Sequence, residues 1–278
     1  MKRLAVVGTG KMGGTIFNLL RKTHNVSAVE KNATIRKHFT GALSHVEDLE
    51  GNYDAVIIAV KPSDAPLTAR EMYFTEHNFK TDNIISVMAG VTTTTLSRLF
   101  PENRITRAMP NLTIGTRNGL TSVYSPMGNA DLAVSLFEEG GGLIHKANSD
   151  TEIDLATCIS ASGPAYFLKM AEVMAAEAEA TGLRRIEARM LARSALRSAN
   201  IMSENGGTIL DIASPGGTTE QGLNTLERYN FSSAITSALR KSLDRAIKLD
   251  YDTNNQLDKY MIFREDSLGK WQRLSNKN

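Results

Sequence analysis

Close to its start the chain reads Leu4-Ala5-Val6-Val7-Gly8-Thr9-Gly10-Lys11-Met12-Gly13, an apolar run followed by a Gly-x-Gly-x-x-Gly pattern. The apolar run predicts a buried strand, and residues 12–20 have the apolar spacing of a helix. In such a strand-turn-helix unit, Gly8 permits the tight turn, Gly10 lets the backbone approach a pyrophosphate, and Gly13 lets the helix pack closely on the strand. The helix N-terminus then offers free N–H groups to the phosphate charge. The predicted dinucleotide-binding residues of this turn are Gly8, Thr9, Gly10, Lys11, Met12 and Gly13.

A glycine pattern of this kind is not specific by itself, because a glycine-rich turn can also be purely structural. Here it follows a predicted strand, opens a predicted helix and lies at the start of the chain, which favours the dinucleotide interpretation.

Glu30 ends the second predicted strand, about 20 residues after the glycines, where an acidic residue typically binds the ribose 2′-OH and favours NAD. Its carboxylate would also repel a 2′-phosphate. Lys31, Asn32 and Arg36 follow, however, and could hold that phosphate if Glu30 turns away. The sequence therefore leaves NAD and NADP open as the cofactor, and Lys31 and Arg36 could equally belong to a solvated surface.

The first half of the chain alternates β-rich runs with amphipathic segments. The predicted strands are residues 4–7, 26–29, 55–59, 84–87 and 105–109. Strands separated by helices imply βαβ units and a parallel, doubly wound sheet. Residues 55–60 are continuously apolar, as expected for a central strand buried on both faces, and Lys61-Pro62 ends it.

The second half has a different composition and pattern, because it is rich in Ala, Leu, Met, Glu and Arg at helical spacing. It predicts helices over residues 166–181, 185–203, from 218 onward, and over 231–249. We therefore expect three segments: a dinucleotide-binding domain over 1–150, an all-helical domain over 151–250, and a polar tail over 251–278 that holds the only tryptophan.

The bulk composition excludes several classes of protein. A net charge of +2, from 32 basic and 30 acidic residues, argues against a dedicated nucleic-acid or membrane-surface binder. The single cysteine, Cys158, rules out an intrachain disulfide, and the five histidines lack metal-ligand spacing. No apolar run is long enough to span a membrane, and the N-terminal run is too short for a secretory signal. We expect a cytoplasmic, metal-free protein.

The helical half contains two segments rich in glycine and hydroxyl side chains, residues 160–166 and 214–219, each directly before a predicted helix. Such helix starts present unpaired N–H groups, which suit a carboxylate or another small anion. Either segment could be a simple capping turn. For Ser-Pro-Gly-Gly-Thr-Thr (214–219) we favour an anion site, because two glycines and three hydroxyls exceed what capping needs.

These two segments also resemble the signature segments of the pyrroline-5-carboxylate reductase family. Other motifs agree in order with that family: the glycine loop 8–13, Ala59-Val60-Lys61-Pro62, residues 88–91 and Arg107-Ala108-Met109-Pro110-Asn111. The resemblance covers about residues 3–249. It implies a Rossmann-type domain followed by a helical dimerisation domain, and reduction of 1-pyrroline-5-carboxylate to L-proline by NADH or NADPH. It also implies a homodimer, which in many members assembles further into a decamer.

The resemblance also implies roles for single residues. Ala59, Val60, Lys61 and Pro62 would border the nicotinamide, and Asn111 would contribute to the cofactor site. The substrate carboxylate would bind the four N–H groups of Gly216, Gly217, Thr218 and Thr219. Ser214 and Thr219 would be the catalytic hydroxyls, with Thr219 near the ring nitrogen. Asp150 stands where the family often has a substrate-side glutamate, although it could equally be a helix N-cap. The implied substrate-binding residues are Gly216, Gly217, Thr218 and Asp150.

Three alternatives remain at this stage. A related imine reductase could act on another cyclic substrate, since residues 204–214 form a shorter segment than the family leads us to expect. A β-hydroxyacid dehydrogenase would use a helical lysine and an asparagine one turn later; Lys169 fits, but Val173 stands at the asparagine position. A non-catalytic nucleotide-sensing protein is disfavoured by the intact glycine and hydroxyl loops.

Overall fold

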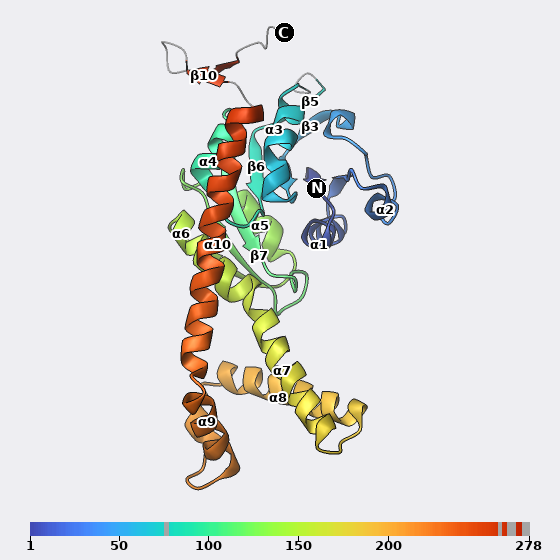
Figure 1. Cartoon of the computed structure of the whole chain (residues 1–278). Coiled ribbons are helices and arrows are strands. Elements are labelled where there is room, and N and C mark those ends of the chain that lie inside the picture. The colour runs from blue at the N-terminus through green and yellow to red at the C-terminus, as the bar shows by residue number, and fades with distance from the viewer. Residues whose placement is uncertain (75–77, 261–262, 266–270, 274–278) are drawn as a thin grey trace. The chain divides into compact units, whose positions relative to one another are not determined.

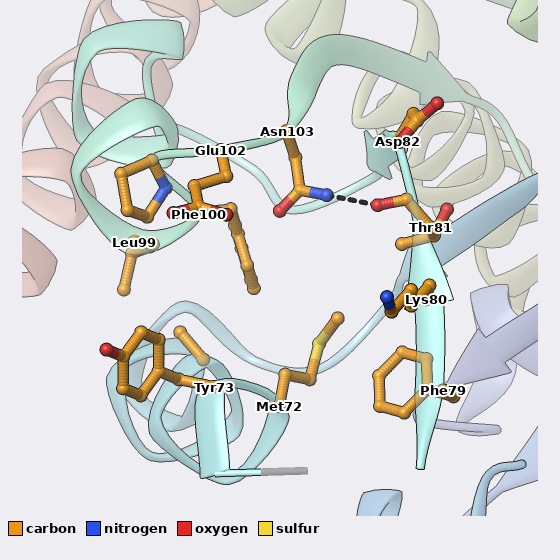
Figure 2. Close-up of a pocket in the computed structure, with 12 residues that line it drawn as sticks. Met72, Tyr73, Phe79, Lys80, Thr81, Asp82, Leu99, Phe100, Glu102 and Asn103 are labelled. Carbon is orange, nitrogen blue, oxygen red and sulfur yellow. Dashed lines mark hydrogen bonds between the residues drawn. The ribbon is translucent and has the colours of Figure 1, made fainter. Parts of the chain in front are cut away.

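The computed structural model describes residues 1–74, 78–260, 263–265 and 271–273 (Figure 1). The described helices are α1 (Lys11–Leu20), α2 (Ala33–Arg36), α3 (Ala65–Phe74), α4 (Thr93–Leu99), α5 (Asp131–Glu138), α6 (Asp150–Ala156), α7 (Gly163–Ala180), α8 (Arg185–Glu204), α9 (Thr218–Arg228) and α10 (Phe231–Tyr260). The strands of the main sheet are β1 (Arg3–Val7), β2 (Asn25–Val29), β4 (Ala55–Ile58), β6 (Asn83–Ser86), β7 (Arg104–Pro110), β8 (Leu120–Tyr124) and β9 (Leu143–Lys146). Two small sheets pair β3 (Gly51–Tyr53) with β5 (Phe79–Thr81), and β10 (Phe263–Glu265) with β11 (Trp271–Arg273).

The main sheet has seven strands in the order β2-β1-β4-β6-β7-β8-β9. Neighbouring strands from β2 to β7 are parallel, β7 and β8 are antiparallel, and β8 and β9 are again parallel. The chain passes from β1 to β2 on one side and then crosses to β4 on the other. The strand order therefore reverses at β1, and in such sheets ligands bind beyond the carboxyl ends of the strands at this point.

The core lies on both faces of the sheet, because the side chains of successive residues in each strand point to opposite faces. In β1, Ala5 and Val7 join the apolar layer that includes α3 and α4, whereas Leu4 and Val6 join the layer that includes α1 and α5. All four residues of β4 are fully buried. This double burial explains why the strand has no polar alternation in its sequence.

The sequence predicted the five parallel strands and a fold of this class, and both are confirmed. It missed β3, β5, β8 and β9. These strands are short or polar, and β9 is a partly exposed edge strand, so none carries a continuous apolar run. The sheet is consequently mixed at one side, where β8 runs against β7.

The structure groups the chain into two compact units that differ from the expected segments 1–150, 151–250 and 251–278. The first unit comprises Met1–Ala161 and Ser242–Asn278, and the second comprises Ser162–Lys241. The first unit thus includes α6 and takes up α10 from Ser242 onward, and α10 itself continues to Tyr260 instead of ending near residue 249. Of the expected polar tail, residues 251–260 are helix, whereas 261–262, 266–270 and 274–278 lie outside the described residues.

The second unit has a small apolar core of its own. Helices α7 and α8 pack through Ala171, Ala175, Ala188 and Ala192, whose small side chains let the two backbones approach closely. Much larger apolar side chains stay on the surface of these helices, among them Ile186, which is 83% exposed. A group of large exposed apolar side chains of this kind marks an interaction surface.

Gly90 lies in the loop that follows β6, and it tests how closely this loop packs against α10. Its φ is +77°, and a Cβ placed there would lie 2.3 Å from the carbonyl oxygen of Ala246 on α10. We predict that Gly90→Ala lowers the free energy of unfolding by about 3 kcal/mol, from backbone strain and overlap together. Urea unfolding measures this loss.

Gly128→Ala is the matched control, because Gly128 has φ +69° but open space around its Cβ position. This control should lose only about 1 kcal/mol. Equal losses in the two variants would contradict the close approach of α10.

Candidate active site

The glycine loop between β1 and α1 is shaped by close backbone contacts. Gly8 has φ +90°, and a Cβ there would lie 2.9 Å from the carbonyl carbon of Ala59. A Cβ on Gly13 would lie 1.9 Å from the carbonyl oxygen of Gly8. Gly10 differs, because a Cβ on it would meet no protein atom within 4 Å. Packing thus explains Gly8 and Gly13, whereas Gly10 faces open space that a dinucleotide pyrophosphate can fill.

The start of α1 is suited to an anion. Gly10 is its N-cap residue, and within the described part of the chain the cap receives no side-chain hydrogen bond and the first turn contains no acidic residue. The first-turn N–H groups therefore keep their hydrogen-bonding capacity, and the helix dipole adds a positive potential. Lys11 is exposed at the first helical position, and Met12 packs against the apolar layer beneath.

Glu30 turns back toward the glycine loop. Its Oε2 accepts a hydrogen bond from the Thr9 N–H at 2.8 Å, and its Oε1 accepts one from the Asn32 N–H at 2.9 Å. Thr9 itself is buried. The carboxylate therefore fixes the turn in addition to any contact with a ribose hydroxyl.

The basic residues after Glu30 also have contacts within the chain. Lys31 forms an ion pair with Glu71 at 2.7 Å. The Arg36 Nη1 donates to the carbonyl oxygens of Glu30, at 2.8 Å, and of Lys31, at 3.2 Å. Arg36 thereby stabilises the turn that follows β2, and both side chains remain close to the end of that strand.

The other predicted cofactor residues lie at the same edge of the sheet. Ala59 and Val60 follow β4 and are partly buried, Lys61 is exposed, and Pro62 opens a short 3-10 turn. Asn111 follows β7, and its Oδ1 accepts hydrogen bonds from the Thr113 hydroxyl and N–H. Because the carboxyl ends of β1, β2, β4 and β7 share one edge, the structure brings the predicted cofactor residues together.

A buried ion-pair network lies behind this edge. Arg107 on β7 is 0% exposed; its Nη1 donates to Asp150 at 2.6 Å and its Nη2 to Asp154 at 2.7 Å. Burial raises the pKa of the Asp154 carboxyl, and the Arg107 guanidinium opposes that shift. Removing one partner from such a network typically costs about 3–5 kcal/mol, because a buried charge loses its counter-charge.

Asp150 has a structural role in this network. Besides Arg107, its two carboxylate oxygens accept hydrogen bonds from the Thr93 N–H at 3.0 Å and the Thr93 hydroxyl at 2.6 Å. The alternative expectation that Asp150 is a helix N-cap is wrong by one residue. Ser149 is the N-cap of α6, and its hydroxyl accepts from the Glu152 N–H.

The loop 214–219 lies in the second unit and precedes α9. Gly216 has φ +74°, and its N–H donates to Glu220 Oε2 at 2.8 Å. The Gly217 N–H donates to the Ser214 carbonyl at 3.0 Å, and a Cβ on Gly217 would lie 2.7 Å from the Ser214 hydroxyl oxygen. Both glycines are therefore required by the turn, and the loop itself uses both of their N–H groups.

Two of the four N–H groups expected to bind an anion, those of Gly216 and Gly217, are thus already hydrogen-bonded within the loop. The first hydrogen bond along α9 runs from the Gln221 N–H to the Gly217 carbonyl. Thr218 and Thr219, one and two residues into the helix, come before that bond, so the helix provides no acceptor for their N–H groups. The hydroxyls of Ser214 and Thr219 accompany them in the same short segment.

Sequence reasoning missed Glu220 and the Arg107 network. Glu220 stands three residues after the N-cap Gly217, the capping-box position, so its spacing signals a contact with this turn. A capping box would pair it with the Gly217 N–H, however, and nothing in the sequence indicates that Gly216 is the donor. Arg107 is an isolated arginine inside a strand, and Asp150 and Asp154 are spaced four residues apart on one helix face. Nothing in the sequence alone links the strand to that helix.

The described helices include none whose length and apolarity would suffice to cross a membrane. No cluster of three or more His, Cys, Asp or Glu side chains able to hold a metal ion occurs among the residues that the structure describes. Cys158 is buried.

Comparison with known proteins agrees with this geometry. Residues 150–249 match the family model for pyrroline-5-carboxylate reductase dimerisation, and residues 3–90 match the model for NADP oxidoreductase, coenzyme F420-dependent. The pyrroline-5-carboxylate reductase of Thermus thermophilus is 32% identical over 260 residues, which cover 86% of this chain and 97% of that protein. The chain belongs to the pyrroline-5-carboxylate reductase family. The Escherichia coli member is 29% identical over 269 residues, covering 89% of this chain and 98% of that protein.

Solved structures of family members share the fold. Pyrroline carboxylate reductase from Plasmodium falciparum, with NADP bound, superposes with a TM-score of 0.77 at 22% identity, covering 90% of this chain and 98% of that one. The Coxiella burnetii pyrroline-5-carboxylate reductase gives a TM-score of 0.71 at 26% identity, covering 89% and 98%. As a member of this family, the chain is an NAD(P)-dependent oxidoreductase whose helical domain self-associates.

The contrast between Gly10 and Gly13 generates a paired prediction. Gly10→Val should lower the free energy of unfolding by only about 1 kcal/mol, because its Cβ meets no neighbour and the cost is that of a poorer N-cap residue. It should nevertheless abolish dinucleotide binding, measured by fluorescence titration with NADPH and NADH. Gly13→Val should lose at least about 3 kcal/mol of stability, because its Cβ overlaps the Gly8 carbonyl oxygen. Dinucleotide binding that survives in Gly10→Val would refute the pyrophosphate assignment.

The position of Glu30 predicts a shift in cofactor preference. In Glu30→Gln the amide oxygen can still accept from the Thr9 N–H, while the amide NH2 replaces the acceptor of the Asn32 N–H, and the negative charge that opposes a 2′-phosphate is gone. The ratio of kcat/KM with NADPH to kcat/KM with NADH should rise about tenfold, or ~1.4 kcal/mol. Glu50→Gln, the same charge change beside the amino end of β1, should leave the ratio unchanged. An unaltered ratio in Glu30→Gln would remove Glu30 from cofactor discrimination.

Proposed function

We propose that this protein reduces 1-pyrroline-5-carboxylate to L-proline with NADH or NADPH. The proposal rests on two features of this family member. The glycine loop has open space at Gly10, and the turn at the start of α9 is rich in hydroxyl side chains. The first suits a dinucleotide and the second a small carboxylate, and reduction of this substrate needs both.

The residues at the carboxyl edge of the sheet hold the cofactor in this proposal. The N–H groups at the start of α1, from Gly10 onward, bind the pyrophosphate, and Glu30 with Lys31 face the adenosine ribose. Residues 59–62 and Asn111 border the nicotinamide end. A bound reduced nicotinamide supplies the hydride, so the chain itself needs to provide orientation rather than a strong base.

The loop before α9 holds the substrate. The N–H groups of Thr218 and Thr219 receive the carboxylate, aided by the N-terminal end of the helix dipole. The Ser214 and Thr219 hydroxyls complete the contacts, with Thr219 at the ring nitrogen. Gly216 and Gly217 shape the turn, since their own N–H groups are already used within it. Asp150 contributes indirectly, by holding Arg107 and Thr93 in place.

We further propose that self-association produces a homodimer through the helices of the second unit, with a decamer as a higher assembly. The large exposed side chains of α7 and α8 support this proposal, because their burial would remove apolar area that the chain leaves in water. The alanine-lined contact between the same helices provides a rigid support for that surface.

Thr219 is the residue whose substitution tests the substrate site most directly. We predict that Thr219→Ala lowers kcat/KM for pyrroline-5-carboxylate about 100-fold, because a hydrogen bond to the reacting ring is lost. The dissociation constant of NADPH should stay within about twofold of the wild-type value. Thr219 is not among the residues at the carboxyl ends of β1, β2, β4 and β7, hereafter the cofactor edge, that are proposed to bind the dinucleotide.

Thr225→Ala is the matched control, because Thr225 lies six residues further along α9 and its hydroxyl bonds only the Gln221 carbonyl among the described contacts. It should retain wild-type turnover. Wild-type kcat/KM in Thr219→Ala would exclude Thr219 from the mechanism.

A further inference from the structure

The end of α10 is built into the first unit. Thr253 and Leu257 are 1% and 2% exposed, and Leu257 belongs to the apolar layer that includes α3 and α4. A helix end that is only loosely attached would not bury both a hydroxyl and a leucine completely. The residues from Asp250 to Leu257 are therefore a fixed part of this unit, hereafter the α10 end segment.

Polar contacts join the α10 end segment to the loop that follows β6. Asp250 Oδ1 accepts a hydrogen bond at 2.8 Å from the N–H of Thr92, the N-cap residue of α4. One turn later, Asn254 Oδ1 accepts from the Arg98 guanidinium at the other end of α4. Together, Asp250 and Asn254 hold both ends of α4 against α10.

The same segment reaches the turn that follows β4. The Thr253 hydroxyl donates to the Leu249 carbonyl at 2.8 Å and lies 3.4 Å from the carbonyl oxygen of Pro62. Just before the segment, Ala246 approaches Gly90 so closely that no side chain fits at Gly90. Since β4 and β6 are adjacent strands, these contacts fall on two neighbouring loops of the cofactor edge.

The α10 end segment begins where the family match ends, at residue 249. The contacts of Asp250, Thr253 and Asn254 therefore lie just beyond the region that the family model matches.

We propose that the α10 end segment positions the cofactor-edge loops after β4 and β6, with Asp250 as its principal positioning residue. The inference rests on the proposed function in so far as Pro62 borders the nicotinamide. Asp250 does not touch the reacting atoms. It acts through the Thr92 N–H, which fixes the loop 88–93.

The test compares three variants of the full-length protein. Asp250→Ala removes the acceptor for the Thr92 N–H. Asp250→Asn keeps an acceptor oxygen without the charge and is the conservative rescue. Asp252→Ala is the matched control, because Asp252 is the next acid on the same helix and contacts the exposed Arg245 at 3.5 Å. For each variant we would measure the NADPH dissociation constant by fluorescence, amide hydrogen exchange over residues 88–95, and kcat and KM with pyrroline-5-carboxylate.

For Asp250→Ala we expect the NADPH dissociation constant and cofactor KM to rise about tenfold, with faster exchange over residues 88–95, because the nicotinamide-side loops lose their support. Asp250→Asn should stay within about twofold of wild type, and Asp252→Ala should be unchanged. Should Asp250→Ala fold poorly, Asp250→Ser is the substitute, since its shorter side chain cannot reach the Thr92 N–H.

A purely structural role gives a different pattern, in which thermal stability falls but cofactor affinity and KM stay at wild-type values; that pattern would overturn the proposal. Failure of the proposed function can be distinguished from failure of this inference. A wild-type protein that binds NADPH but does not reduce pyrroline-5-carboxylate would refute the substrate, while the binding and exchange measurements would still decide the role of Asp250.

Discussion

The close contact between the β1–α1 turn and the end of β4 is the constraint on which the cofactor edge depends. No side chain fits at Gly8 or Gly13, because the backbone of residues 59 and 60 and the Gly8 carbonyl occupy that space. This contact fixes where α1 begins and directs its first N–H groups toward the open side of Gly10. A small change of backbone geometry here would misplace both the helix N-terminus and the strand end beside it.

A second principle recurs across the molecule: a carboxylate from one segment satisfies the backbone N–H groups of another. Glu30 does so for the glycine loop, Asp150 and Asp250 for the start of α4, and Glu220 for the loop before α9. The contacts of Glu30, Asp150 and Asp250 are part-buried, where an unpaired N–H group is costly, so these acids allow irregular backbone to be rigid. Rigid loops are what hydride transfer requires, since its rate depends on the alignment of donor and acceptor.

Much of this structure follows from the sequence. The glycine loop, the five parallel strands and the helical second half have strong local signals, in glycine spacing and in apolar periodicity. The edge strands β8 and β9 do not, because they are half-exposed and lack a continuous apolar run. The continuation of α10 past residue 249 was missed for a related reason. Its polar composition lacks the apolar periodicity of a helix and indicated only a polar tail, whereas Thr253 and Leu257 are buried by tertiary contacts.

The candidate site was predictable in position but not in detail. The sequence places Ser214 and Thr219 in an anion-binding turn, yet it does not reveal that Gly216 donates its N–H to Glu220. Such contacts depend on side-chain conformations that only the folded loop defines. The same holds for Arg107, whose partners lie more than 40 residues away in sequence.

The most direct test of the central claim is the loss of nicotinamide absorbance when the purified protein is mixed with pyrroline-5-carboxylate and either NADPH or NADH. The proposed function predicts rapid, protein-dependent oxidation of the cofactor with L-proline as the product. Folded protein that binds the cofactor but oxidises it only with a different cyclic imine would contradict the claim. In that case the short segment 204–214 would belong to a site for another substrate.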